Sequence, residues 1–445
     1  MTTILNRIDT ETPAPQRRRV RRGRSATATQ PQTVAIVGMG YVGLPTALGM
    51  LDAGTPVIGV DIDRGRLAAI ERCDVDVLDA DMDRLHRYLP TDAFALSSDP
   101  SAISDAQTVI VCVPTPISGH FDPDLGALSS ACHDVVAHAT PGQTIILTST
   151  TYVGCTRDMI IEPLQARGMS VGRDIHVAYA PERVDPGVAG HVIEATPRVV
   201  GGATEACTEA AVVTLSHTCP SLQAVSSPEA AELTKLLENS FRAVNIALAN
   251  EMSDVAEHFG LSPIEIVDAA ATKPYGFMPF YPGPGVGGHC IPCDPHYLLW
   301  QLRAERMTSP VVDAAMTDIA QRPKRVVTRI REMLADAGIP MHGAQVHVVG
   351  VAYKPAVADL RESPALEILH DLSEAGVRIS YTDHHIPELT IDGQHLASQT
   401  AAPASADLVL VHTRHPDADL GWVNQHARVL DATYRLEEVA HRELV

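Results

Sequence analysis

The chain has 445 residues, of which 45% are hydrophobic and 20% are charged, so it is long enough for two or three domains with ordinary globular cores. Its formal net charge of −20 argues against general affinity for nucleic acid or an anionic membrane, and no segment approaches the roughly 20 apolar residues of a membrane span. The eight cysteines follow no regular spacing, which indicates reduced thiols in a cytoplasmic protein rather than a disulfide scaffold.

The first 31 residues are rich in arginine, proline, threonine and glutamine. Within them, the basic segment RRRVRRGR is not followed by the apolar stretch of a secretory or twin-arginine signal. We therefore expect residues 1–31 to form a disordered basic tail. A tail that binds a polyanion or a partner protein is the alternative.

Strands and helices alternate from residue 32 onward. Apolar, β-branched segments predict strands, and the segment 41–54 predicts a helix closed by Gly54. The strand segments are 33–40, 56–63, 108–114, 144–150 and 175–181. Such alternation is typical of a parallel sheet with helices on both faces, so residues 32–222 are expected to form a Rossmann-like domain.

The first of these strands leads into GMGYVG, which places Gly38, Gly40 and Gly43 in a G-x-G-x-x-G pattern. The pattern alone is weak evidence, but here it follows a strand, opens a helix and is answered by Asp61 after the next strand. Glycines allow a pyrophosphate to approach the backbone at a helix N-terminus. Because the Asp61 carboxylate would bind ribose hydroxyls and repel a 2′-phosphate, the segment predicts NAD rather than NADP.

A long helix is predicted over 227–260, with Ser227 and Pro228 at its start and a glycine at its end. Its leucines keep helical spacing, so we expect either a spine between two domains or a dimer interface. Lys235 and Asn239 share another face of this helix. Such a pair is ordinarily solvated, but an ammonium and an amide side by side are also suitable donors for an oxyanion.

The glycine-rich stretch GPGVGGHCIPCDP comes after the long helix and contains Cys290 and Cys293. A zinc knuckle would need a second pair of ligands, for which only His289 and His296 are near, so no metal is expected. A redox dithiol would lie at a strand-to-helix junction without this loop. A buried, inert cysteine and a nucleophilic Cys290 remain, and glycines that let a ligand come close favour the nucleophile.

A second α/β pattern begins after Pro323, with helices at 324–338 and 363–376 and strands at 344–353, 377–383 and 406–413. The expected fold is therefore α/β, with two Rossmann-like doubly wound domains, the second at 323–445, joined by a central long-helix domain at 223–322.

The second α/β half has no glycine fingerprint. Lys354 and Arg361 lie where a crevice should open beyond a strand, and they could neutralise a phosphate. The alternative is that they are solvated surface charges.

Seven motifs in this order resemble the UDP-sugar 6-dehydrogenase family, over about residues 33–435. They are GMGYVGLP, VPTP, TSTTYVG, APERVDPG, ELTKLLENSFRAVNIALANE, PGPGVGGHCIPCDP and GVAYKPAVADLRESPA. The resemblance implies a four-electron oxidation of the sugar C6 alcohol to a carboxylate with two NAD⁺. Cys290 would attack the aldehyde formed first, giving a thiohemiacetal, then a thioester that water releases as the acid.

The resemblance also implies a role for each matching residue. Lys235 and Asn239 would stabilise oxyanions, Asp294 and Thr150 would position or activate water, and Glu182 would assist in acid–base steps. Residues expected to contact NAD are Gly38, Gly40, Tyr41, Val42, Gly43, Asp61, Arg66, Pro114, Thr115, Thr150 and Arg361. Residues expected to contact the UDP-sugar are Glu182, Arg183, Val184, Lys235, Asn239, Phe280, Tyr281, Gly283, Gly287 and Lys354.

Two details bear on the substrate. The stretch KPYGFMPFYPGPG resembles the branch acting on UDP-N-acetylglucosamine, and Cys293 stands where the UDP-glucose branch typically has lysine. The stretch LDATYRL lacks an arginine-bearing motif of many relatives, so no substrate contact is predicted there.

We therefore expect a cytoplasmic UDP-N-acetylglucosamine 6-dehydrogenase that forms a homodimer, or a higher oligomer, through the long helix. UDP-glucose and UDP-N-acetylmannosamine are alternative substrates. A two-electron dehydrogenase of the hydroxy-acid type and a non-catalytic NAD sensor are the alternatives from other classes.

Overall fold

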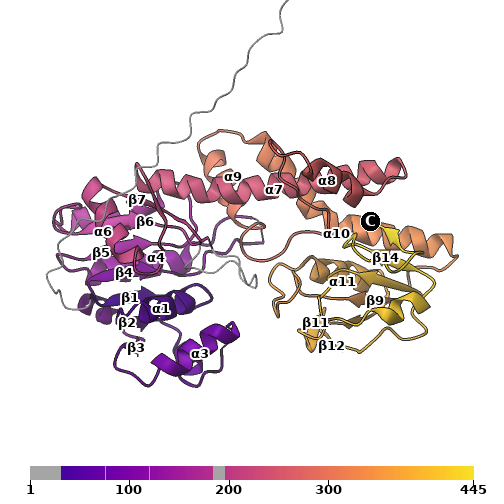
Figure 1. Ribbon diagram of the computed structural model, residues 1–445, viewed down its shortest axis with the longest axis horizontal. Coiled ribbons are helices and arrows are strands. Elements are labelled where there is room, and N and C mark those ends of the chain that lie inside the picture. The colour runs from indigo at the N-terminus through magenta and orange to yellow at the C-terminus, as the bar shows by residue number, and fades with distance from the viewer. Residues whose placement is uncertain (1–31, 76, 120, 184–195) are drawn as a thin grey trace, which may run out of the picture.

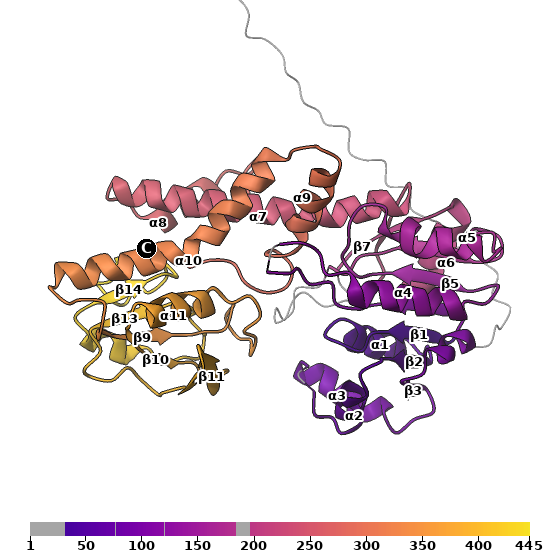
Figure 2. The same cartoon turned by 180° about the vertical axis from the view of Figure 1, so that it is seen from behind.

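The computed structural model describes residues 32–75, 77–119, 121–183 and 196–445. It places two α/β lobes side by side, with long helices running across both of them (Figures 1 and 2). The expected tail at 1–31 lies outside the described residues. Among the described residues, none of the helices combines the length and the apolar character that a membrane crossing requires.

The first lobe is built on an eight-stranded sheet in the order β3-β2-β1-β4-β5-β6-β7-β8, in which only β6 and β7 pair antiparallel. The strands are β1 (Val34–Val37), β2 (Val57–Val60), β3 (Phe94–Ser97), β4 (Thr108–Val111), β5 (Thr144–Leu147), β6 (His176–Tyr179), β7 (Arg198–Gly202) and β8 (Leu222–Val225). The order reverses direction between β1 and β4, which is where open α/β sheets bind ligands.

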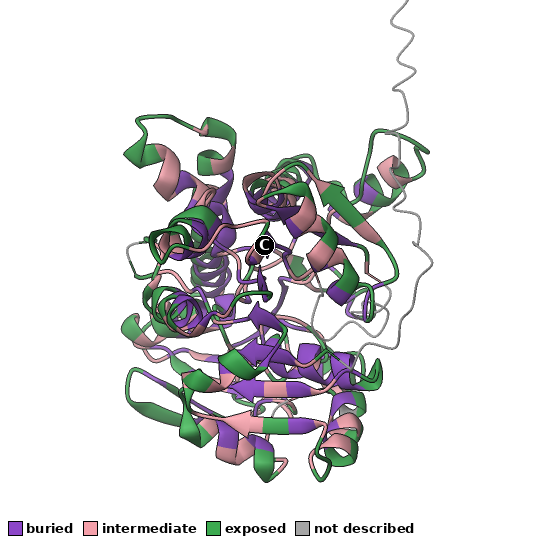
Figure 3. Ribbon diagram, turned by 90° about the vertical axis from the view of Figure 1, so that its left-hand side faces the viewer, coloured by how far each residue is buried: buried purple, intermediate pink, exposed green. Residues whose placement is uncertain are grey.

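Helices cover both faces of this sheet. They are α1 (Gly43–Asp52), α2 (Arg64–Glu71), α3 (Asp79–Tyr88), α4 (Gly126–His138), α5 (Glu162–Ala166) and α6 (Glu205–Leu215), with short turns at η1 (Pro100–Asp105) and η2 (Arg157–Ile161). Alternate residues of a strand point to opposite faces, so Ile36 packs in a core with Leu44 of α1, and Val37 packs in another with Leu128 of α4. From the end of this lobe, the central strands are buried and exposed residues lie on outer helix surfaces (Figure 3).

The second lobe has a parallel five-stranded sheet in the order β10-β9-β13-β14-β15. Its strands are β9 (Gln345–Val349), β10 (Arg378–Thr382), β13 (Leu408–Val411), β14 (Val429–Asp431) and β15 (Glu443–Leu444), and a hairpin of β11 (Glu388–Ile391) and β12 (Gln394–Ala397) lies beside it. Helix α11 (Pro364–Glu374) packs on one face, whereas the short turn η3 (Gly421–Gln425) contributes to the core on the other. This order reverses between β9 and β13.

Four helices connect the lobes: α7 (Pro228–His258), α8 (Pro263–Ala271), α9 (Asp294–Ala304) and α10 (Pro310–Asp336). The predicted start of α7 is confirmed, because Ser227 Oγ accepts a hydrogen bond from Ala230 N over 3.2 Å. Helix α10 continues through Pro323, and its second half packs into the core of the second lobe. The predicted domain boundary at 322/323 therefore falls inside one continuous helix, which ties the second lobe to α7.

Candidate active site

The first crevice lies at the reversal point between β1 and β4. Gly38 ends β1 with a φ of +91°, and a Cβ on Gly43 would lie 1.8 Å from the carbonyl oxygen of Gly38, so this strand-to-helix turn requires glycine at both positions. A Cβ on Gly40, in contrast, would meet nothing within 4 Å, and the neighbouring Tyr41 and Val42 are exposed. Packing does not account for glycine at Gly40, whereas a pyrophosphate approaching the backbone does.

Asp61 and Arg66 hold the same peptide at the rim of this crevice. Asp61 Oδ2 accepts from Met39 N over 2.7 Å, and Arg66 Nε donates to Met39 O over 2.8 Å. Arg66 Nη2 is buried without a partner in the described part of the chain. An orphaned guanidinium nitrogen beside a carboxylate and an open glycine fits a dinucleotide, whose ribose and phosphate oxygens would complete these contacts.

A buried polar cluster lies where α7 and α9 meet. Asn239 Nδ2 of α7 donates to Asp294 Oδ2 at the start of α9, and a side-chain hydrogen bond from Thr150 reaches the same carboxylate. Lys235, 8% exposed, donates through Nζ to Glu182 O over 2.8 Å. The structure thus brings these five residues together, and the face of α7 that carries Lys235 and Asn239 is buried.

The Asp294 carboxylate is 2% exposed, and this burial raises its pKa from 3.8 to about 6. The positive charge of Lys235 and the hydrogen bonds from Asn239 and Thr150 oppose the rise. A carboxyl group with this pKa exchanges protons near neutral pH, so it is suited to general acid–base chemistry.

The two cysteines of the C-x-x-C stretch have different environments. Cys290 is exposed, one turn ahead of Asp294, whose N donates to Cys290 O over 2.8 Å. Cys293 is 2% exposed, and burial raises the pKa of its thiol to about 12, so it stays protonated and unreactive. The neighbouring His296 stacks on Phe121, with ring centroids 4.6 Å apart. Cys290 is thus the thiol of this pair that a substrate can reach.

The glycines before Cys290 mostly serve packing. A Cβ on Gly287 would lie 2.6 Å from Glu362 O, one on Gly288 would lie 2.8 Å from the ring of Tyr353, and one on Gly285 would lie 2.7 Å from Pro364. These three glycines let the loop pack closely against the second lobe. The sequence interpretation explained them only by the approach of a ligand and did not include this packing.

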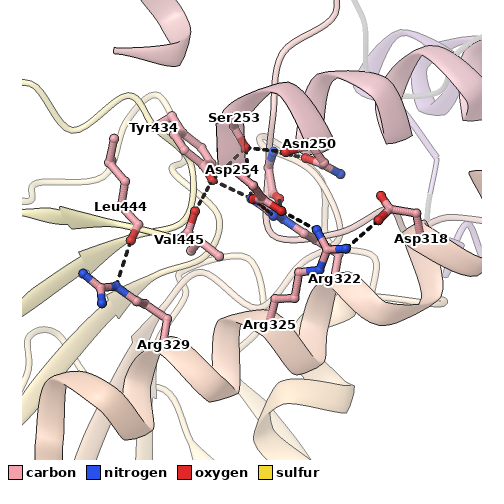
Figure 4. A network of polar contacts seen from close by, with 11 residues as sticks. Asn250, Ser253, Asp254, Asp318, Arg322, Arg325, Arg329, Tyr434, Leu444 and Val445 are labelled. Carbon is pink, nitrogen blue, oxygen red and sulfur yellow. Dashed lines mark hydrogen bonds and ion pairs between the residues drawn. The ribbon is translucent and has the colours of Figure 1, made fainter. Parts of the chain in front are cut away.

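A polar network fixes Gly283, the one glycine of this loop whose Cβ would meet nothing within 4 Å. Figure 4 shows Asn250, Arg322, Asp254 and Tyr434 of this network. Asn250 Oδ1 accepts from Gly283 N, and Arg322 Nε donates to Gly283 O, both over 3.0 Å. Arg322 is fully buried, and it also contacts Asp254 and Tyr434. Helices α7 and α10 and the second lobe therefore hold this peptide together.

A cavity of about 670 Å³ opens beside Gly283, between α8, the loop and the second lobe. The polar residues of its wall include Asp268, His412, Thr413, Arg414, Tyr434 and Arg435. The guanidinium of Arg435 lies 4.6 Å from the ring centre of Tyr281, whose hydroxyl donates to Asp268. Sequence reasoning missed Arg435 because LDATYRL lacks the arginine motif of many relatives, although its own arginine faces this cavity.

The second lobe also reaches back to the first crevice. The guanidinium of Arg361 lies 4.3 Å from the ring centre of Tyr41, and its Nη2 donates to Asp359 over 2.6 Å. Lys354, on the same loop, is half-buried. Arg361, predicted to contact the cofactor, is therefore placed beside the G-x-G-x-x-G turn by a loop from the other domain.

The remaining predicted residues are spread around the cluster. Thr115 is buried and its carbonyl accepts from the hydroxyl of Tyr297, while Pro114 is exposed at the end of β4. Arg183 pairs with Glu238, and Phe280 lies edge-on to Phe241. Val184 lies outside the described residues.

Comparison with known proteins identifies all three regions. Models of the UDP-glucose/GDP-mannose dehydrogenase family match residues 32–217 as the NAD binding domain, 229–318 as the central domain and 347–435 as the UDP binding domain. The UDP-N-acetyl-D-mannosamine dehydrogenase of Escherichia coli K12 is 31% identical over 398 residues, covering 86% of this chain and 93% of that protein. The NDP-N-acetyl-D-galactosaminuronic acid dehydrogenase of Ralstonia nicotianae is 31% identical, covering 86% and 91%.

A solved structure, described as a UDP-D-ManNAc dehydrogenase from Pyrococcus horikoshii, is also similar. It superposes with a TM-score of 0.84 at 29% identity and covers 93% of this chain and 98% of that chain. The similarity therefore extends over both lobes and the helices between them.

Proposed function

The chain belongs to the UDP-glucose/GDP-mannose dehydrogenase family of NAD-dependent oxidoreductases, and from this premise we propose that it oxidises C6 of a UDP-N-acetylhexosamine to the carboxylate in two steps. The observation that carries the proposal is the meeting of Asp294, Asn239, Lys235 and Thr150 one turn from the exposed Cys290.

The residues divide the chemistry between them. When bound, NAD⁺ accepts one hydride in each of the two oxidations. Cys290 adds as a thiolate to the aldehyde carbon, and after the second oxidation the carbon is held as a thioester. Lys235 and Asn239 donate to the oxyanion of the adduct. Asp294, with a pKa near 6, takes one proton of the water that attacks the thioester carbon, and as the C–S bond breaks the sulfur of Cys290 leaves as the thiolate.

The second lobe supplies the nucleotide site in this proposal. The cavity beside Gly283 contains Arg435 and Arg414 for phosphate and the aromatic ring of Tyr353 for stacking. Lys354 and Arg361 lie on the loop between this cavity and the first crevice, where they suit the pyrophosphates of the two ligands. Arg183 and Glu182 lie beside Lys235 and would contact the sugar.

Relatives and sequence pattern favour different N-acetylhexosamines. The E. coli relative is named for UDP-N-acetyl-D-mannosamine, whereas the stretch before the loop favours UDP-N-acetylglucosamine. We place UDP-N-acetylmannosamine first because both the E. coli relative and the Pyrococcus horikoshii structure are named for it. A panel of UDP-N-acetylmannosamine, UDP-N-acetylglucosamine, UDP-N-acetylgalactosamine and UDP-glucose, ranked by kcat/KM, decides between them.

Counting NADH per sugar acid tests the reaction itself. The proposal requires two NADH per acid, and it requires Cys290→Ser to lose at least about a thousandfold in acid formation, because the thioester cannot form. Cys293→Ser is the matched control, since the buried Cys293 thiol has no role and its variant should keep turnover. One NADH per sugar, or full turnover by Cys290→Ser, would exclude the two-step scheme.

We also propose that the chain forms a homodimer through α7. An apolar stripe runs along the exposed side of this helix, with successive members three, four or seven residues apart. Its members are Leu233, Leu237, Phe241, Leu248, Met252, Val255 and Phe259, each 41–70% exposed in the single chain. Sedimentation of Leu237→Glu should show a monomer, whereas Val213→Glu, a change at another exposed apolar residue on α6, should leave the dimer intact.

A cytoplasmic location is part of the same proposal. No cysteine in the described part of the chain is in a disulfide, which suits a reducing compartment.

A further inference from the structure

The second lobe has its own crevice, at the reversal point between β9 and β13, and three histidines gather there. His384 and His385 follow β10, and His415 follows β13. Their ring centroids are 4.1, 4.6 and 4.9 Å apart in pairs. Each histidine offers one ring nitrogen as a ligand atom, and these three nitrogens lie within 4.8 Å of one another. We refer to these three residues as the histidine cluster.

The hydrogen bonds of the cluster resemble the surroundings of a metal ligand. His415 Nε2 lies 3.1 Å from Asp383 Oδ2, and His384 Nε2 lies 2.9 Å from Asp417 Oδ2. Histidines that bind a metal through one ring nitrogen usually hold a carboxylate or a carbonyl with the other. In both rings Nδ1 is then the nitrogen left to coordinate, and His415 Nδ1 would release the N–H of Ala356, which lies 3.1 Å away.

His385 supplies the observation that points to a ligand. Its Nε2 is buried and has no partner among the described residues. Leaving a buried polar nitrogen without a partner is unfavourable, so this atom is a natural position for a coordinate bond. Its backbone N meanwhile donates to Asp383 Oδ1 over 2.9 Å, which holds the residue in place.

Asp383, which lies behind His415, is held by several hydrogen bonds. Its side chain is fully buried, and Oδ2 accepts from Val351 N over 2.8 Å and from Ala352 N over 3.1 Å. It therefore connects the ends of β9 and β10 with His415 beyond β13. A carboxylate held in this way fixes the ring of His415 in one orientation.

We propose that the histidine cluster binds one divalent transition-metal ion of the Zn²⁺ type, with His384, His385 and His415 as ligands and Asp383 and Asp417 behind them. Three imidazoles select zinc, copper, nickel or iron(II) over magnesium and calcium, which prefer oxygen. Tetrahedral ligands at about 2.05 Å from zinc lie about 3.3 Å from each other. The ligand nitrogens of the cluster lie within 4.8 Å of one another, so they must come closer to bind the ion, and the side chain of His384, which is 42% exposed, has room to move.

The position of the site indicates what the ion does. The cluster borders a cavity of about 460 Å³ that none of the proposed catalytic residues lines. Through Asp383, which accepts from Ala352 N, it contacts the start of the loop that carries Arg361 to the first domain. The ion is therefore a structural clamp on this loop, and the proposal does not depend on which sugar is oxidised.

Metal titration of the full chain tests the proposal. The chelator-treated protein, in a Cys290→Ser background so that the exposed thiol does not compete, is titrated with Co²⁺ by visible absorption and with Zn²⁺ by calorimetry. We expect one ion per chain, the strong visible bands of cobalt with nitrogen ligands, and a higher melting temperature with Zn²⁺.

Variants assign the binding to the cluster. His384→Ala and His385→Ala should each weaken binding at least about tenfold and remove the thermal shift, and Asp417→Asn should weaken it about 10- to 100-fold. These residues are exposed or half-buried, so the variants should fold, unlike changes at the buried His415. His395→Ala, an exposed histidine in the β11–β12 hairpin, is the control and should bind as the parent does. Failure of the parent to bind one ion, or parental affinity in both His384→Ala and His385→Ala, overturns the proposal.

Discussion

The crevices of the two lobes have the same framework. Gly38 follows β1 and Gly350 follows β9, both with positive φ, and a Cβ on either would collide with a carbonyl oxygen just after the strand beyond the reversal point. Asp61 after β2 and Asp383 after β10 both accept a backbone N–H from the segment just beyond the glycine. The first two strands and their carboxylate are therefore equivalent in the two lobes.

The two lobes differ in the segment just beyond this glycine. In the first lobe α1 begins at Gly43, so a helix N-terminus and the open Gly40 face the crevice. In the second lobe the loop 351–363 intervenes before α11, and it extends away to place Arg361 on Tyr41 of the first lobe. The first crevice thus offers a helix N-terminus and an open glycine to a dinucleotide, whereas the second crevice holds the histidine cluster.

The largest effect on activity is expected at Asp294, which lies at the start of α9 between the two lobes. Asp294→Asn should lower kcat by about 10² to 10⁴, the usual contribution of a general acid or base. Burial raises the pKa of Asp294 to about 6, so the carboxylate is ionised above pH 6 and protonated below it. For a base, kcat should therefore fall about tenfold per pH unit below 6, and Asp294→Asn should lack this acid limb.

A pH series of kcat for both proteins, with substrates saturating, measures this. Binding in either lobe should not follow the same limb, so the Kd for NAD⁺ in each protein serves as the control. A parent profile that is flat between pH 5 and 7 would mean that Asp294 does not titrate in the rate-limiting step.

The next effect separates the ligand sites of the two lobes. Gly40→Val should weaken NAD⁺ binding by roughly 5- to 150-fold, because the added side chain takes the place of the ligand at a cost of about 1–3 kcal/mol. No protein atom lies within 4 Å of a Cβ there, so the melting temperature should hold. Gly283→Val is the matched variant: its Cβ also meets nothing within 4 Å, and it should raise the KM for the UDP-sugar while leaving the Kd for NAD⁺ unchanged.

Calorimetry gives the Kd for NAD⁺ of each variant, and steady-state kinetics gives the KM of each variant for the UDP-sugar. If both variants weaken the binding of the same ligand, the assignment of NAD⁺ to the first crevice and of the UDP-sugar to the cavity beside Gly283 is wrong.

Much of the framework could be predicted because its signals are local. The predicted strands at β1, β2, β4, β5, β6, β9, β10 and β13 and the helices at α1, α7 and α11 are confirmed, since alternation and capping residues specify them within a few positions. The start of α10 could not be predicted in this way, because a proline such as Pro323 ordinarily breaks a helix, yet here the helix continues through it.

Features that depend on distant partners could not be predicted. The glycines at 285, 287 and 288 pack on Pro364, Tyr353 and Glu362, and nothing in the loop sequence indicates those neighbours. The histidine cluster was missed for the same reason, because only the folded sheet brings the ends of β10 and β13 together. On α7 the sequence distinguished the face that carries Lys235 and Asn239 from the leucine stripe, but it did not predict which of the two faces is buried.

The smallest effect is expected where Tyr434 of the second lobe contacts Arg322 of α10. Tyr434 accepts from Arg322 Nη2 over 2.5 Å and donates to Val445 O over 2.7 Å (Figure 4). Tyr434 also lines the cavity beside Gly283. Tyr434→Phe should therefore cost about 1–2 kcal/mol of unfolding free energy and increase hydrogen exchange at Gly283, which Arg322 also holds.

Tyr381→Phe is the control, because it removes a buried tyrosine hydroxyl that makes no hydrogen bond to Arg322 or Gly283 in the described part of the chain. Tyr381 is equally buried and donates to Ile386 O over 3.0 Å within the second lobe, so its variant should lose similar stability without loosening Gly283. Exchange measured by mass spectrometry on both proteins gives the comparison. Equal exchange at Gly283 in the two variants would show that the cavity wall is held by the lobe alone. Faster exchange in Tyr434→Phe only would show that the ligand site of the second lobe, unlike that of the first, is completed by helices outside its own domain.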